Sequence, residues 1–187
     1  MRVLIAGAGV IGTVYGAHLA GAGHAVSVLS HPPRTEDVAR NGLVAHDVLE
    51  GSRAAARVSV VPDAAGTPFD LVLVTVRSDQ LAAACARLTG LTGSPAVVFF
   101  GNNPGGRAAI SGQVHGDVML GFPGVGGTIR GAPSALVPAF CRRAPQAGNQ
   151  RNTAAAVPGW PASALQDLGH RAGPPKGPYR PIPGERS

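Results

Sequence analysis

The first 130 residues alternate between short apolar runs and stretches in which apolar positions recur at helical spacing. Residues 3–6 form a β-branched apolar run, and a helical pattern follows at once over residues 10–22. Residues 25–30 repeat the strand pattern, and residues 70–76 are apolar on both faces, as in a central parallel strand. Strands that alternate with helices in this way predict an α/β fold with a doubly wound, mostly parallel sheet of the Rossmann type.

Shorter elements fill the rest of this region. Thr35 is expected to cap a short helix that stops at Gly42, and Ser78 to cap a helix that runs through Leu88. Residues 124–131 are dense in glycine and predict a short strand with turns. Further strands are expected at residues 43–45, 58–61, 95–100 and 118–122.

The first strand runs directly into glycines with the spacing G-x-G-x-x-G, which is the dinucleotide-binding fingerprint when a strand precedes it and a helix follows. Gly7 permits a tight turn, Gly9 lets a pyrophosphate approach the backbone, and Gly12 lets the helix pack close to the strand. The phosphates then lie at the helix N-terminus, where free N–H groups favour an anion. The expected phosphate-binding residues are Gly7, Ala8, Gly9, Val10, Ile11 and Gly12.

The end of the second strand indicates which dinucleotide is bound. NAD-binding domains carry an acid there, about 20 residues after the glycine motif, for the adenosine ribose. This chain has Ser30, His31 and, slightly later, Arg34 instead. A hydroxyl and two potential cations favour a 2′-phosphate, and therefore NADP(H). The alternative is that His31 and Arg34 are solvated loop residues, and Glu36 and Asp37 follow closely enough to weaken the argument.

The formal net charge of +6 is concentrated at the end of the chain. Residues 1–130 hold 9 basic and 8 acidic residues, whereas residues 131–187 hold 7 basic and 2 acidic ones. No aromatic residues interleave the arginines, so nucleic-acid binding is not expected. The two cysteines have no metal-ligand spacing, which indicates a reducing cytoplasm and no metal site. No run of 18 apolar residues exists, so no membrane span is expected.

Residues 131–187 follow a different pattern, with 10 of the 17 prolines and little apolar periodicity. A segment of this composition does not form a packed domain, and it is expected to be a disordered, low-complexity basic tail after a domain of residues 1–130. Two origins stay open, a natural tail and the product of a reading-frame shift.

Three motifs together resemble the N-terminal half of the ketopantoate reductase (2-dehydropantoate 2-reductase) family. They are residues 7–12, then Leu73-Val-Thr-Val-Arg-Ser-Asp-Gln80, then Gly101-Asn-Asn-Pro-Gly105, at successive strand ends. The resemblance covers about residues 1–130. It implies NADPH-dependent reduction of a 2-oxo acid to a 2-hydroxy acid on the pathway to pantothenate. It also implies a second, helical domain that supplies a general-acid lysine and a substrate-binding glutamate. Neither the lysine nor the glutamate is recognisable in this sequence, so no catalytic residue is assigned.

Four residues within the second and third motifs are candidate site residues. Arg77 stands at the family's lysine and would present a cation to the cofactor phosphates or the substrate carboxylate. Gln80 follows the central strand by a few residues and would approach the nicotinamide, and the alternative is that it only faces solvent. Asn102 aligns with the family's asparagine near nicotinamide and substrate, and Asn103 replaces a glycine beside it. Two other interpretations stay open: an NADP(H)-binding module without turnover, and a dehydrogenase of the 6-phosphogluconate or glycerol-3-phosphate type.

Overall fold

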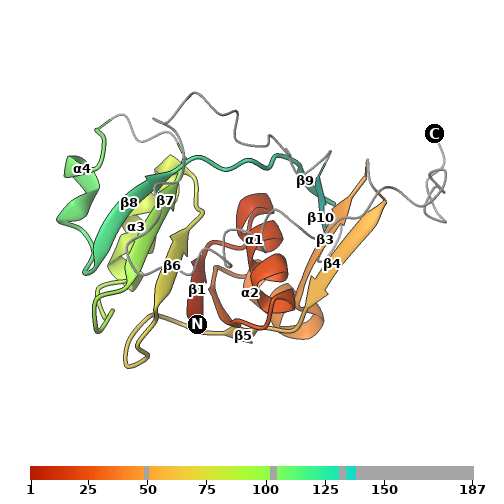
Figure 1. Ribbon diagram of the computed structural model, residues 1–187, viewed down its shortest axis with the longest axis horizontal. Coiled ribbons are helices and arrows are strands. Elements are labelled where there is room, and N and C mark those ends of the chain that lie inside the picture. The colour runs from red at the N-terminus through yellow and green to blue at the C-terminus, as the bar shows by residue number, and fades with distance from the viewer. Residues whose placement is uncertain (49–50, 102–104, 131–133, 138–187) are drawn as a thin grey trace.

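The computed structural model describes residues 1–48, 51–101, 105–130 and 134–137, which form two sheets with helices around them (Figure 1). The larger sheet has six strands in the order β5-β2-β1-β6-β7-β8, and every neighbouring pair is parallel. The predicted Rossmann-type α/β fold is therefore confirmed. The strands are β1 (Arg2–Ala6), β2 (Ala25–Leu29), β5 (Ser59–Val60), β6 (Leu71–Val74), β7 (Ala96–Phe100) and β8 (Asp117–Gly121).

Helices connect these strands and cover both faces of the sheet. They are α1 (Val10–Gly21), α2 (Arg34–Asn41), α3 (Leu81–Arg87) with the preceding 3₁₀ turn η1 (Ser78–Gln80), and α4 (Ala108–Ser111). After Arg2, the residues of strand β1 are all apolar and buried, because their side chains face helices on both sides of the sheet. Leu4 packs with Cys85 of α3 in one core cluster, whereas Ile5 packs with Ala17 and Leu19 of α1 in another. Alternate side chains of a buried parallel strand serve two helical layers.

A second sheet, in the order β4-β3-β10-β9, lies against the other side of α1 (Figure 1). Val14 of α1 is buried there with Ala45 and Val125. Gly16 allows the close approach, since a Cβ atom at this position would lie 2.5 Å from the Leu43 Cδ1 atom. The strands are β3 (Leu43–Asp47), β4 (Ser52–Ala56), β9 (Thr128–Arg130) and β10 (Ser134–Val137).

Two expected helix caps are wrong. Helix α2 begins at Arg34 after Pro33, and the Thr35 hydroxyl bonds the Ser30 hydroxyl at 3.0 Å instead of capping the helix. Ser78 lies inside η1, so it does not cap the helix that follows. The stop at Gly42 is confirmed, because this residue ends α2 with φ +77° and its N–H reaches the Val38 carbonyl at 2.8 Å.

Three elements were not predicted, namely β4, α4 and β10. Strand β10 lies beyond residue 130, in the segment assigned to the tail, and pairs with both β3 and β9. The remainder of that segment, residues 131–133 and 138–187, lies outside the described residues, so the tail stays a prediction.

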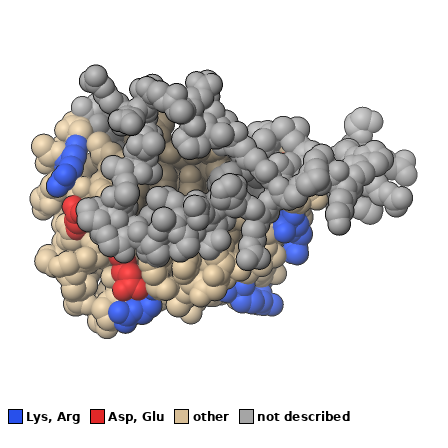
Figure 2. All heavy atoms as spheres, in the orientation of Figure 1, with Lys and Arg blue, Asp and Glu red and all other residues tan. Residues whose placement is uncertain are grey.

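The described surface carries both signs of charge. On the face shown in Figure 2, basic and acidic side chains are scattered among uncharged ones. Within the described ranges, no helix is both long and apolar enough to cross a membrane. Nor do three or more histidine, cysteine, aspartate or glutamate side chains gather there as a metal site would require.

Candidate functional site

The glycine loop between β1 and α1 lies at the carboxyl edge of the large sheet, between the ends of β2 and β6. The Gly7 N–H bonds the Leu29 carbonyl at 2.8 Å, and the Thr75 N–H bonds the Ala6 carbonyl at 2.8 Å. Gly7 adopts φ +107°, which favours glycine. At Gly12 a Cβ atom would lie 2.6 Å from the Thr75 Oγ1 atom. Helix α1 therefore approaches the sheet more closely than any side chain at this position would allow.

The opposite side of the loop is open. A Cβ atom at Gly9 would meet nothing within 4 Å among the described residues. Gly9 is the N-cap of α1, with no side-chain cap and no acidic residue in the first turn. Neither the N-cap nor the first turn itself thus offers these N–H groups a side-chain acceptor, which is the arrangement that binds phosphate at helix N-termini.

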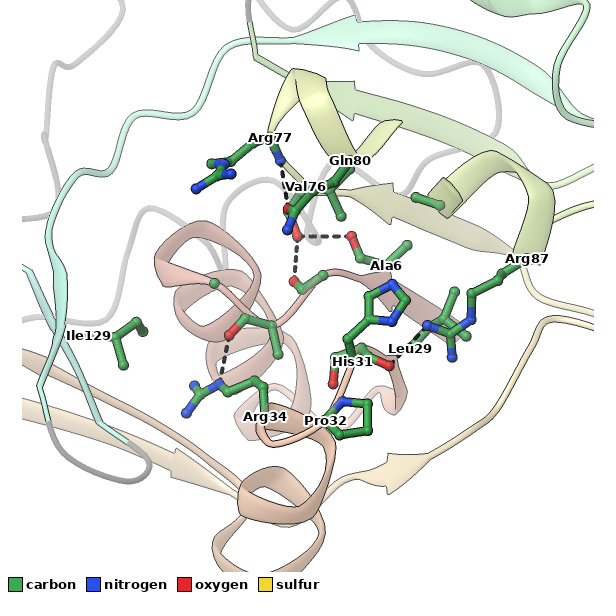
Figure 3. Close-up of a pocket in the computed structure, with 16 residues that line it drawn as sticks. Ala6, Leu29, His31, Pro32, Arg34, Val76, Arg77, Gln80, Arg87 and Ile129 are labelled. Carbon is green, nitrogen blue, oxygen red and sulfur yellow. Dashed lines mark hydrogen bonds between the residues drawn. The ribbon is translucent and has the colours of Figure 1, made fainter. Parts of the chain in front are cut away.

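A cavity of about 420 Å³ adjoins this loop (Figure 3). Its volume lies within the range of small-molecule sites. Its walls come from the loop, the β2–α2 turn, the segment after β6, helix α3 and strand β9. The lining residues are Ala6, Gly7, Ala8, Gly9, Leu29, Ser30, His31, Pro32, Arg34, Thr75, Val76, Arg77, Gln80, Ala84, Arg87 and Ile129.

Arg34 joins the β2–α2 turn to the glycine loop. Its Nε donates to the Ala8 carbonyl at 2.8 Å, and its Nη2 donates to the Thr13 hydroxyl at 2.9 Å. Its Nη1 is buried and has no hydrogen-bond partner among the described residues. Burial lowers the pKa of this guanidinium, and the Asp37 carboxylate partly opposes the shift. Arginine stays protonated despite this, so a cation with a free donor lies beside the phosphate-binding loop.

Ser30 and His31, which the sequence analysis expects to bind the cofactor, both line the cavity. The Ser30 side chain is nearly buried, and its hydroxyl is already engaged with that of Thr35. Val10 and Ile11 do not line the cavity, because their side chains pack toward the cluster of Val14 and Ala45. Only their backbone N–H groups are placed to take part in anion binding.

Arg77 and Gln80 line the cavity on the β6 side. The Arg77 guanidinium forms two bonds to Asp79, Nε to Oδ1 at 3.0 Å and Nη2 to Oδ2 at 2.5 Å. This pairing raises the pKa of Arg77 and lowers that of Asp79. The expected cation is therefore present at the cavity, but an acid that sequence reasoning did not single out partly neutralises it. The Gln80 side chain accepts the Arg77 N–H at 3.4 Å.

Asn102 and Asn103, the expected substrate-side residues, lie outside the described residues. They follow β7 by two and three positions. Strand β7 pairs with β6 in parallel, so its carboxyl end meets the same sheet edge as Arg77.

Thr75 is a site residue that sequence reasoning quoted only as part of a motif. Its hydroxyl bonds the Gly7 carbonyl at 2.6 Å and lies 3.2 Å from the Ala6 carbonyl. The side chain is buried, so it ties the end of β6 to the glycine loop.

Replacing Thr75 by valine should destabilise the domain by about 1–3 kcal/mol, because a side chain of similar volume would leave the part-buried Gly7 carbonyl without its hydroxyl donor. Nucleotide affinity should fall as well, since the glycine loop loses an anchor. Urea unfolding and calorimetric titration measure the two effects. Thr75→Ser keeps the hydroxyl and is the matched control, so equal losses in both variants would contradict the assignment.

A parallel sheet whose first strand turns through G-x-G-x-x-G into a helix, with a cavity at its carboxyl edge, is the architecture of a dinucleotide-binding domain. The family model for ketopantoate reductase PanE/ApbA matches residues 3–132. The chain belongs to this family, as the sequence motifs predicted.

Solved structures of other proteins share the fold. The 2-dehydropantoate 2-reductase from Methylococcus capsulatus is 26% identical with a TM-score of 0.60, and the match covers 74% of this chain and 46% of that one. The enzyme from Geobacter metallireducens GS-15 is 20% identical, covers 73% and 46%, and has a TM-score of 0.60. A ternary structure of D-mandelate dehydrogenase with NADH and anilino(oxo)acetate is 18% identical, covers 73% and 45%, and has a TM-score of 0.61.

Each of these matches is partial, because the chain spans less than half the length of each of these structures. No curated protein matches the chain.

Proposed function

We propose that this domain binds NADP(H) and forms the cofactor-binding half of a reductase that converts a 2-oxo acid, ketopantoate in the first instance, to the 2-hydroxy acid. The bound cofactor would supply the hydride. The observation that carries the proposal is the buried Arg34 Nη1, which has no partner among the described residues and lies beside an open glycine loop. A buried guanidinium with an unused donor favours an anion.

The residues present fit such a ligand. The pyrophosphate would lie over Gly9 against the first turn of α1, where an added Cβ would find open space. The adenosine 2′-phosphate would lie at the β2–α2 turn, where Arg34 offers its free donor and His31 a second polar group. The Ser30 and Thr35 hydroxyls meet at 3.0 Å, and because this bond uses only one of their two hydrogens, the other stays available to a phosphate oxygen.

The nicotinamide and substrate would then lie toward the carboxyl ends of β6 and β7. Arg77 and Gln80 line that side of the cavity. We assign Arg77 to the substrate carboxylate or the cofactor phosphates, Gln80 to the nicotinamide side, and Asn102 and Asn103 to the substrate. A 2-oxo acid carries one carboxylate, and Arg77 is the cation proposed to pair with it on the β6 side of the cavity. The reaction belongs to the pathway to pantothenate, and we place the protein in the cytoplasm.

A second candidate function is an NADP(H)-binding module without turnover. The ionisable side chains that line the cavity are His31 and three arginines. Arginine does not release its proton in proteins, and His31 lies at the adenosine end. Within the described ranges, the cavity thus binds anions better than it moves protons.

The unmodified chain should bind NADPH more tightly than NADH, and Arg34→Gln should remove most of this preference. A charge-assisted bond to a desolvated phosphate contributes about 1.5–3 kcal/mol, or roughly 10- to 150-fold in affinity. Calorimetric titration of both cofactors measures the preference.

Arg40→Gln is the matched control, because Arg40 lies on the same helix and pairs with Glu36 at 3.7 Å on the surface. This variant should keep the preference for NADPH. Equal or better binding of NADH by the unmodified chain would reject the proposed cofactor.

A further inference from the structure

Arg87, the last residue of α3, connects three parts of the fold at the cavity wall (Figure 3). Its Nη1 donates to the Ser30 carbonyl at 2.9 Å. Its Nε and Nη2 donate to the Pro62 carbonyl at 3.0 and 2.6 Å. Its own carbonyl accepts the Ala64 N–H at 3.2 Å. Three donors of one side chain therefore hold two backbone segments that are remote in sequence.

One of the two carbonyls that Arg87 bonds is that of Ser30, the first residue after β2. The peptide unit is planar, so fixing the Ser30 carbonyl also fixes the orientation of the Ser30–His31 peptide. Inside the turn, the Thr35 N–H bonds the His31 carbonyl at 3.1 Å, and the Ser30 and Thr35 hydroxyls meet at 3.0 Å. The turn is thus internally bonded, and Arg87 attaches it to α3 and to the segment after β5.

The guanidinium suits this role because its donors have a fixed planar arrangement, which a lysine ammonium lacks. Arg87 is half-buried, and its described bonds all go to backbone carbonyls rather than to a carboxylate. Its positive charge is therefore not paired by any of these bonds. The geometry of the side chain, and not only its charge, determines where the turn lies.

We propose that Arg87 is a positioning residue that sets the shape of the β2–α2 turn, Ser30 to Arg34, and thereby the selectivity for a 2′-phosphorylated adenosine nucleotide. The inference rests on the proposed function and adds to it a residue on α3, outside the glycine motif and outside the turn itself. Arg87 acts through Ser30, and Arg34 is the group that meets the phosphate.

The test compares adenosine 2′,5′-bisphosphate with AMP, because these ligands differ only by the 2′-phosphate. Calorimetry on the full chain gives the ratio of the two affinities for the unmodified protein, Arg87→Lys and Arg87→Gln. Arg87→Lys keeps the charge and loses the planar donor arrangement, so it separates position from electrostatic attraction. We expect it to reduce the ratio by about tenfold, as when one well-placed charge-assisted bond is lost.

Arg57→Gln is the matched control. Arg57 also donates to a backbone carbonyl, that of Arg40, at 2.5 Å, but it does not line the cavity. This variant removes the same charge and should leave the affinity ratio unchanged. Thermal unfolding of every variant shows whether a change in ratio merely follows a loss of stability.

Hydrogen exchange in the absence of ligand gives an independent measure. Amides of His31 and of residues 34–37 should exchange faster in both Arg87 variants and at the normal rate in Arg57→Gln. An unchanged affinity ratio in Arg87→Lys, or unchanged exchange in Arg87→Gln, would overturn the positioning role. If the unmodified chain binds neither nucleotide, the proposed function is overturned, and the selectivity assigned to Arg87 with it, whatever the exchange rates show.

Discussion

Replacing Gly9 by valine should abolish dinucleotide binding while the domain stays folded. The residue has φ −71° and ψ −165°, which a β-branched residue tolerates, and an added Cβ would meet nothing within 4 Å among the described residues. The same open space lies over the first turn of α1, where the pyrophosphate is proposed to bind. A valine side chain would fill that space and separate the phosphates from the helix N–H groups.

The loss should be at least about 100-fold in affinity, since two or more charge-assisted bonds contribute about 1.5–3 kcal/mol each. Calorimetry with NADPH measures it, and thermal unfolding confirms the fold. Gly21→Val is the matched control, because Gly21 ends the same helix and also faces open space. Retained NADPH affinity in Gly9→Val would remove the phosphate-binding assignment of the glycine loop.

The centre of the large sheet could be predicted because β6 and residues 3–6 of β1 are buried on both faces. Strands β1 and β6 lack polar residues at their centres. Such continuous apolar runs indicate a buried strand even when the strands that pair with it are unknown. Strand β4 was missed because its sequence, Ser-Arg-Ala-Ala-Ala, is small and half-exposed, and it becomes a strand only by antiparallel pairing with β3. Strand β10 likewise depends on the pairing that β3 and β9 offer from distant parts of the chain.

The site residues also differ in how far they could be predicted: those in contiguous motifs could be, and those whose contacts are remote in sequence could not. The glycine loop is contiguous, so its spacing alone indicates where a helix N-terminus meets a strand end. Arg87 and Pro62 are 25 residues apart, and Arg87 and Ser30 are 57 apart, so nothing local reveals their contact. Asp79 is only two positions from Arg77, but sequence proximity alone does not show that its carboxylate bonds the guanidinium.

Expressed by itself, the 187-residue chain should reduce ketopantoate with NADPH at least about a hundredfold more slowly than a full-length reductase of the family. The carbonyl oxygen needs a proton as the hydride arrives, and a positioned general acid contributes about 10²–10⁴-fold. On the substrate side of the described cavity stand Arg77, bonded to Asp79, and Gln80. Neither an arginine nor an amide donates a proton readily. The single lysine of the sequence, Lys176, lies outside the described residues.

Steady-state NADPH oxidation with ketopantoate measures this rate, with a full-length family reductase assayed in parallel. NADPH affinity determined on the same preparation separates slow chemistry from failure to bind. A chimera that joins residues 1–137 to the helical half of a family reductase is the positive control. Recovery of turnover in the chimera would show that the cofactor half is competent and that the proton donor is what the chain alone lacks. Full turnover by the 187-residue chain would contradict the expectation, because a proton donor outside the described residues, or one from a second subunit, would then already serve the site.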